Sequence, residues 1–363
     1  MSKQAGTRKQ ASKRYQETTT PQLKYGLTIR LRTKGLDLQA HEQPDKQPTP
    51  GVTNTNCEVQ ELFTTNTSAH KHLYTTKAAD HTRFDDFNYA HANQGLLITV
   101  PENAQATCEL DRELTKTSVE HVLVVAHKNS TLQLIDRQTG SPELHSATVE
   151  VIAHEGAHVQ YATIQTLDTW DLTSYRGVAH KDAQIDWFVA SLGAGFQRAT
   201  VDTQLVGAGA GARSYGVFLG VGSEQFDLSA TSYHEADNTS SDMHTKGVLD
   251  GKSKGVYRGT IDIAADAFGC DGYQKEHTIL LSEDAVADAI PNLEIRNNDV
   301  RCSHGATIGR VDDEQLFYLT SRGIDRQEAV RMLVKGFFEP LTSLLEWPQL
   351  YQEILPIVEE QVL

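Results

Sequence analysis

The sequence of 363 residues is short of cysteines, aromatic residues and long apolar runs, and each shortage excludes a class of protein. None of its four cysteines (Cys57, Cys108, Cys270 and Cys302) lies in a C-x-x-C pair, which excludes a disulfide scaffold and a zinc ribbon. Apolar stretches such as residues 122–126 are far shorter than the roughly 18 residues that a membrane-spanning helix needs. With no secretory signal at the N-terminus, we expect a cytoplasmic protein with reduced thiols and no membrane contact.

Positive charge is also scarce, because 33 Lys and Arg residues stand against 48 Asp and Glu residues, for a net charge of −15. Nucleic acids and anionic membranes are bound by clustered Lys and Arg, so neither is an expected partner. The exception is residues 1–34, which hold nine basic residues and one acid, Glu17. This head is expected to be a flexible, solvated tail, with an organelle transit peptide as the alternative.

The composition divides the chain into three regions. Residues 1–66 are expected to form a polar, partly disordered N-terminal segment that ends in a Pro-rich linker. Residues 67–320 are rich in short alternating apolar and polar stretches, a period of two that predicts β-strands and not helices. The clearest predicted strands are 121–126, 131–136, 148–153, 158–165, 184–192, 196–206, 213–221, 226–234, 242–249 and 253–264. Residues 321–363 are expected to be helical.

Small residues recur between the predicted strands, at 156–157, 193–195, 207–212 and 305–306. Short strands that alternate with tight corners, without long crossovers, favour a solenoid of stacked turns, that is, a β-helix. A β-sandwich is the competing architecture. The repeat keeps one form over a much longer stretch than sandwiches usually do, so the β-helix is preferred.

The C-terminal region begins with a helix signal. Asp325 and Glu328 have the spacing of a capping box, and apolar pairs follow at intervals of four residues. Pro340 is expected to end this helix, and Pro348 and Pro356 to separate two or three further short helices. The apolar stripe, which ends in two adjacent phenylalanines, would either pack on the solenoid or contact another protein.

A zinc-peptidase motif, H-E-x-x-H, is spelled by His154, Glu155 and His158. The chemistry of that motif needs a helix, which places both imidazoles on one face with the glutamate as general base. Here the motif lies between two predicted strands and contains Gly156, so a solvated turn is the preferred interpretation. A zinc metallopeptidase is kept as an unlikely alternative.

The glycine-rich stretch at 207–212 looks like a dinucleotide-binding loop. A phosphate site of that kind requires the N-terminus of a helix directly after the loop. Residues 213–219 are a predicted strand instead, so the stretch is interpreted as a corner of the solenoid.

A third motif contains Cys302 and His304, which are separated by one residue. On a strand, both side chains point to the same face, where a thiolate and an imidazole can bind iron or zinc. Two ligands make an incomplete site, which a partner chain would have to complete. The alternative is a buried small cysteine next to a surface histidine.

The residues around this motif carry a resemblance to a known family. The run Asn-Asp-Val-Arg-Cys-Ser-His-Gly-Ala-Thr-Ile-Gly at 298–309, with the stretches 313–319, 321–324 and 332–338, strongly resembles the SufB/SufD family of the Suf iron–sulfur cluster assembly system. Further matching residues extend the resemblance to about 84–340. The Cys-Ser-His-Gly-Ala form is most similar to SufD, because SufB typically carries a Glu-His-Glu-Ala version.

The resemblance implies a right-handed parallel β-helix core with a small helical C-terminal domain. It also implies a non-catalytic scaffold subunit without a tightly bound cofactor. The β-helix would pair with a SufB-like protein or, as a homodimer, with a second copy of the chain. Cys302 and His304 would lie at that interface and hold iron or a nascent cluster shared with the partner.

By the same resemblance, the C-terminal helices would dock a SufC-like ABC ATPase. The residues expected at that dock are Arg322, Gly323, Glu328, Ala329, Leu333, Phe337 and Phe338. The chain has no Walker phosphate-binding loop, so ATP hydrolysis would belong to the partner. A carbohydrate-binding β-helix is a further alternative, but aromatic residues make up only 7% of the sequence.

Overall fold

Two nine-stranded β-sheets dominate the computed structural model of the protein, which describes residues 2–25, 29–33, 35–63, 71–79, 81–193, 195–344 and 347–362. The first sheet contains β3 (Gly51–Thr55), β6 (Gln105–Leu114), β8 (Thr131–Gly140), β10 (His158–Gln165), β12 (Gln184–Ser191), β14 (Gly211–Gly220), β16 (Ser240–Leu249), β18 (Cys270–Leu280) and β20 (Val300–Arg310). The second contains β4 (Glu58–Glu61), β5 (Gln94–Val100), β7 (Ser118–Ala126), β9 (Leu144–Ala153), β11 (Trp170–Ala179), β13 (Phe196–Leu205), β15 (Gln225–His234), β17 (Lys254–Ile263) and β19 (Val286–Ile295).

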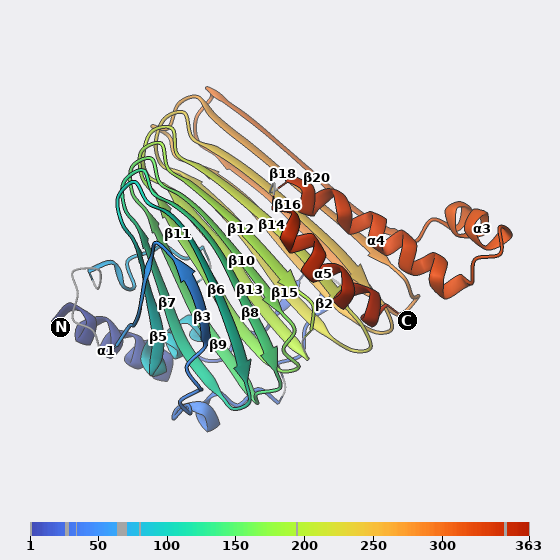
Figure 1. The fold of residues 1–363 in the computed structure, drawn as a ribbon, viewed down its shortest axis with the longest axis horizontal. Helices are drawn as coiled ribbons and strands as arrows, with labels where there is room; N and C mark the ends of the chain where they lie inside the picture. The colour runs from blue at the N-terminus through green and yellow to red at the C-terminus, as the bar shows by residue number, and fades with distance from the viewer. Residues whose placement is uncertain are drawn as a thin grey trace.

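From β5 to β20 the chain alternates between the two sheets, and neighbouring strands within each sheet are parallel (Figure 1). Thr131, His158 and Gln184 occupy the same position on three successive strands of the first sheet. Each turn therefore contributes one strand to each sheet, and the described strands form a β-solenoid of about eight turns. This confirms the β-helix expectation, since a β-sandwich would pair its strands antiparallel.

Most of the predicted strands are present, but the list was incomplete. The strand at His158–Gln165 has the predicted bounds, whereas β6, β11, β18 and β19 were not predicted as strands. In β6 and β18 the outward positions carry charged residues such as Glu109 and Lys275. These strands can be recognised only by aligning them with the strands at the same position in adjacent turns, because little of their own sequence is apolar.

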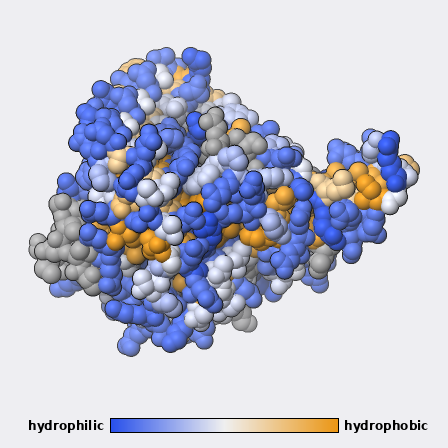
Figure 2. All heavy atoms as spheres, in the orientation of Figure 1, coloured by the Kyte–Doolittle hydropathy of each residue, from blue (hydrophilic) through white to orange (hydrophobic). Residues whose placement is uncertain are grey.

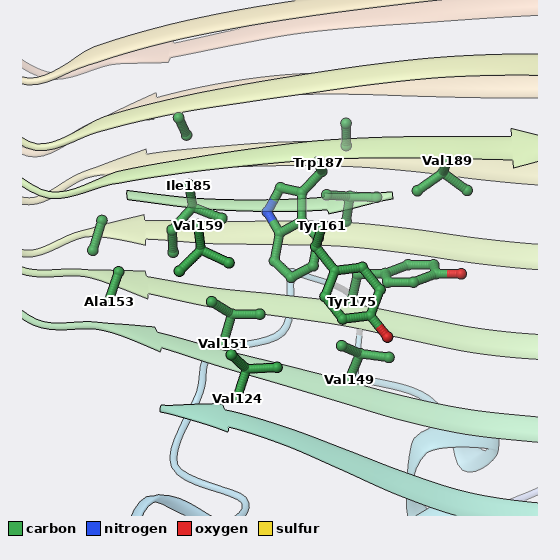
Figure 3. Packing of buried hydrophobic residues seen from close by; sticks show 14 of the residues in the cluster. Val124, Val149, Val151, Ala153, Val159, Tyr161, Tyr175, Ile185, Trp187 and Val189 are labelled. Carbon is green, nitrogen blue, oxygen red and sulfur yellow. The ribbon is translucent and has the colours of Figure 1, made fainter. Parts of the chain in front are cut away.

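The space between the sheets is filled by inward-facing apolar side chains. Trp187, Tyr161 and Tyr175 meet at the centre of this core, among valines from both sheets (Figure 3). The indole Nε1 of Trp187 donates a hydrogen bond to Thr203 Oγ1 at 2.9 Å, so its polar atom is satisfied although the side chain is fully buried. Alternation of side chains along each strand thus gives every turn one buried face.

One corner of the solenoid repeats a left-handed backbone position on successive turns. The residues with positive φ there are Asn103, Asn129, Gly156, Asp182, Gly209, Asn238 and Gly269. Asn, Asp and Gly tolerate this conformation best, which explains why the corners at 156–157 and 207–212 are rich in small residues. The expected corner at 305–306 is wrong, because both residues lie inside β20.

The N-terminal region differs from the expected flexible tail and linker. Ser2–Glu17 form helix α1, which packs against α2 (Arg83–His91), with Arg14 bound to Asp86 at 2.7 Å. Between them lie the short strands β1 (Lys24–Tyr25) and β2 (Ile29–Arg30), the 3₁₀ turn η1 (Leu38–His41), and the strands β3 and β4. β3 pairs antiparallel with β6 in the first sheet and β4 pairs antiparallel with β5 in the second, so these two capping strands cover the first turn of the solenoid.

Three helices follow the last strand: α3 (Asp313–Ser321), α4 (Arg326–Leu344) and α5 (Pro348–Gln361). The side chain of Asp325 accepts a hydrogen bond from the amide of Gln327 at 2.8 Å, as expected at the start of α4. In Figure 1, α4 and α5 lie over the first sheet and α3 projects beyond it.

The expectation that Pro340 ends its helix is wrong, and Pro356 does not interrupt α5 either. Each proline removes one backbone hydrogen bond, but both helices bury an apolar face that includes Phe338 and Ile354. This packing keeps the helices continuous. Pro348 stands at the first position of α5, where a proline is favoured. No helix in the described part of the chain is long and apolar enough to cross a membrane.

Candidate metal centre at the open end of the solenoid

The last turn of the solenoid, formed by β19 and β20, is open. Among the described residues no further strand pairs with the outer edge of either one. No residue of β19 or β20 is buried, and Ile295 and Ile308 are each 39% exposed. An edge with free backbone groups and exposed apolar side chains favours pairing with another sheet.

Cys302 and His304 lie on β20, as the sequence predicted for a shared strand. Cys302 pairs with Gly272 and His304 with Gln274, both of which are buried positions of β18. The two donors therefore belong to the inward-facing side of β20. His304 is nevertheless exposed, because no described strand covers the far side of β20.

The thiol of Cys302 is partly buried and packs against the apolar core. Gly272 makes room for it, since a Cβ at that position would lie 3.2 Å from Cys302 Sγ. Burial raises the pKa of Cys302, and the nearby Asp271 and Cys270 raise it further. The thiol is therefore protonated at neutral pH and loses its proton only when a cation binds to it.

The donor set in this chain is incomplete. Within the described ranges, no group of three or more His, Cys, Asp or Glu side chains is arranged to hold a metal ion. A thiolate and an imidazole suit iron or zinc, but tetrahedral coordination needs further ligands. Cys302 and His304 can bind such a cation firmly only if another molecule supplies the remaining ligands.

Two residues near this site were missed from the sequence. Cys270, on β18, lies close enough to Cys302 to influence its pKa, and its Sγ is 3.2 Å from Thr239 Oγ1. Glu276 is buried on the same strand, and burial raises the pKa of its carboxyl group to about 7. The repeat of one solenoid turn along the sequence would have identified them. It places β18 directly beside β20, although about thirty residues separate the paired positions.

The zinc-peptidase motif does not form a metal site. His154 and Glu155 lie in the turn between β9 and β10, as predicted, and His158 is the first residue of β10. His154 stacks between His127 and His180, with ring centroids 5.5 and 5.3 Å away, whereas His158 Nε2 is 2.7 Å from Asp186 Oδ2. Burial and the neighbouring histidines lower the pKa of His154 to about 4. The two histidines of the motif thus have separate partners.

The predicted docking residues fall into two groups. Arg322, Gly323 and Glu328 are exposed and Leu333 is partly exposed. Ala329 and Phe338 are buried in the helix cluster that covers the first sheet. Phe337 is partly buried against the solenoid, with its ring 4.8 Å from that of His277 and beneath the Nζ of Lys246. The two phenylalanines therefore hold α4 on the solenoid.

Exposed apolar side chains gather instead on α3 and the first half of α4. Phe317 is 73% exposed and Tyr318 54% exposed, and Met332 is exposed close to them in the chain. In Figure 2 apolar residues are visible on the projecting end of the molecule, where Figure 1 places α3. A patch of this kind on an extension from the fold is typical of an interaction surface.

Fold and site together define a class: a parallel β-solenoid with one open, thiol-bearing end and a helical extension. Comparison with known proteins identifies the class more closely. A family model described as SUF system FeS cluster assembly, SufBD core domain, matches residues 97–337. The chain belongs to this SufBD family, whose members are components of iron–sulfur cluster assembly.

Similar proteins include iron–sulfur cluster assembly SufBD family proteins from Staphylococcus haemolyticus, Staphylococcus epidermidis and Staphylococcus aureus. Each is 32% identical to this chain over 280 residues, which is 74% of this chain and 60% of the relative. The chain thus spans about 60% of the length of these relatives.

Proposed function

We propose that the protein is a SufD-like, non-catalytic scaffold subunit of cytoplasmic iron–sulfur cluster assembly. Its open end would pair with a SufB-like protein or with a second copy of the chain. The observation that carries this proposal is the last turn, where exposed Ile295 and Ile308 flank two inward-facing metal donors. A partner that continues both sheets would bury the apolar residues and complete the donor set in one step.

Within this proposal, Cys302 and His304 hold iron or a nascent cluster as cargo at the interface. The partly buried thiol of Cys302 is neutral when the cation is absent, which limits repulsion and premature oxidation. Binding of the cation would displace the thiol proton, and the imidazole would supply a neutral nitrogen ligand. Separation of the partners would leave only two ligands and so promote release.

The docking part of the proposal places a SufC-like ATPase on α3 and the exposed side of α4. Arg322, Glu328 and Leu333 are retained from the predicted set, and the exposed Phe317 and Tyr318 extend it. Phe337 and Phe338 would act from beneath by fixing α4 to the solenoid. ATP-driven dimerisation of two docked ATPases would then pull on the helices and open the solenoid interface.

Co-expression with the SufB and SufC homologues of the same organism tests the assembly. We expect size-exclusion chromatography with light scattering to give one complex with one copy of this chain and two copies of the ATPase. A complex of two copies of this chain with the ATPase would support the homodimer instead. If the chain elutes alone as a monomer, without either partner, the proposed function fails.

Binding of the ATPase is tested with the double variant Phe317→Ala and Tyr318→Ala. We expect it to lose at least about tenfold in affinity while the solenoid unfolds at an unchanged temperature. Phe268→Ala is the matched control, because this aromatic residue is 53% exposed but lies outside the helices. Wild-type retention of the ATPase by the double variant in a pull-down would contradict the docking surface.

A further inference from the structure

Cys57 and Cys108 lie next to each other at the capped end of the solenoid. Cys57 is in the two-residue turn that joins the capping strands β3 and β4, next to Asn56, whose φ is 57°. Asn56 Nδ2 donates to the carbonyl oxygen of Gln105 at 2.9 Å, and Asn54 pairs with Cys108 across the two strands. The turn is thereby held directly over the start of β6.

The two cysteines lie close together. Cys57 Sγ lies 3.7 Å from the carbonyl oxygen of Thr107, the residue before Cys108, and Cys57 packs against the core cluster to which Cys108 belongs. Cys108 faces the inside of the solenoid and is 1% exposed, whereas Cys57 is partly exposed and packs against the edge of the same core. A reagent in solution can reach only the outer thiol of the pair.

The closeness of the two thiols shifts their pKa values in opposite directions. Interaction with the Cys108 thiol lowers the pKa of Cys57 to about 7, with further help from Asn54 and against the effect of burial. The pKa of Cys108 is raised, first by its interaction with Cys57 and then by burial. Cys57 is therefore the nucleophilic thiolate and Cys108 the proton-bearing partner.

We propose that Cys57 and Cys108 form a reversible disulfide that links the capping strands to β6 in the first turn of the solenoid. The oxidant is a low-molecular-weight disulfide. The Cys57 thiolate attacks it, forms a mixed disulfide and releases one small thiolate. Cys108 then loses its proton to solvent and attacks the Cys57 sulfur, which releases the second small thiolate. Two protein thiols are oxidised and one small disulfide is reduced to two thiols.

The other two cysteines are not arranged for this reaction. Cys270 is buried and its Sγ contacts Thr239, whereas burial raises the pKa of Cys302. Disulfides of cytoplasmic proteins are usually transient and respond to oxidants. A disulfide at the capped end would stabilise the capping strands under oxidising conditions and leave the open end unaffected.

The experiment uses the full chain, fully reduced and then equilibrated with oxidised glutathione at about neutral pH. We expect the mass to fall by two hydrogens and a non-reducing digest to contain one linked peptide that joins Cys57 to Cys108. Dithiothreitol should restore both thiols. Cys270→Ser and Cys302→Ser are the matched controls and should form the same link.

The variant Cys108→Ser separates the two steps, since it should stop at a glutathione adduct on Cys57. Cys57→Ser should acquire no adduct at Cys108, because that thiol is covered. The proposal is overturned if the linked peptide is absent from the oxidised wild-type chain, or if the link joins any other pair. An adduct that forms in Cys108→Ser at Cys302 faster than at Cys57 would overturn it as well.

Discussion

The two ends of the solenoid differ in whether the edge strands of the two sheets are covered. At the first turn the capping strands β3 and β4 pair with β6 and β5, while α2, with α1 against it, packs on the second sheet over β7 and β9. At the last turn β19 and β20 have no further strand beside them in the described part of the chain. One end is covered by the chain itself, and the other is open in the described part of the chain.

The burial of the strands at the two ends shows the effect of the cap. In β6, which pairs with the capping strand β3, every second residue from Ala106 to Leu114 is buried, whereas no residue of β20 is buried. Both strands have the same alternation and lie in the same sheet. The difference indicates that exposure of the last turn results from a missing neighbour and not from a weak strand. Solenoids without a polar cap tend to associate at their ends.

The largest expected effect concerns the charged network behind the capped end. Arg112 is buried and binds Glu120 at 2.6 Å and Asp136 at 2.5 Å. Arg112→Met would leave both carboxylates buried without the guanidinium group of Arg112, so we expect a loss of about 3–5 kcal/mol in the free energy of unfolding. Urea denaturation measures it.

The matched control for this variant is Arg310→Met at the open end. Arg310 is exposed and lies 3.5 Å from Glu283, which is also exposed, so its loss should change the free energy by less than about 1 kcal/mol. Equal destabilisation by the two variants would contradict the contrast between the capped end and the open end.

A smaller effect is expected from Glu276, which is buried one strand below the open edge. Burial raises its pKa from 4.5 to about 7, so the folded protein holds a proton that the unfolded chain has lost. Stability from this group is complete below about pH 4.5 and falls as the pH rises through 7, by about 1–3 kcal/mol in total.

Glu276→Gln should therefore be more stable than the wild type at about pH 8 and similar to it at about pH 5. Urea midpoints at both pH values measure this difference. Glu283→Gln is the control, since its side chain is 88% exposed. A wild-type pH profile in Glu276→Gln would exclude this carboxyl group as the cause.

The smallest of the three effects concerns association. Ile308→Glu would place a charge on the open edge, and we expect it to weaken pairing at this end at least about tenfold, or about 1.4 kcal/mol. Val52→Glu is the matched control on the capping strand β3, where the exposure of the apolar side chain is similar. Light scattering of each variant across a dilution series gives the affinity. Equal weakening of association by both variants would mean that the open end is not the preferred site of pairing.

The solenoid could be predicted from the sequence because its signals are local. Alternation gave the strands near Thr131 and His158, and small residues marked the corner at Gly156. Cys302 and His304 could be placed on one strand face from their spacing alone. The capping box at Asp325 marked the start of α4 for the same reason.

Features that depend on distant contacts could not be predicted. Helix α1 has a polar sequence, and its order depends on contacts such as Tyr15 with Phe87 and Arg14 with Asp86. Pro340 was expected to end its helix because the strands that α4 packs against are far away in the chain. The closeness of Cys270 to Cys302 depends on the length of one turn, which no short motif encodes.

The central claim is that Cys302 and His304 are half of a site that a partner completes. Its most direct test is the iron and sulfide content of the purified complex with the SufB and SufC homologues, compared between the wild type, Cys302→Ala and His304→Ala. Cys57→Ser is the control, because this thiol lies at the other end. We predict wild-type content in the control and loss of most of the cluster in the two site variants, with the complex intact. Wild-type iron and sulfide in both site variants would contradict the claim.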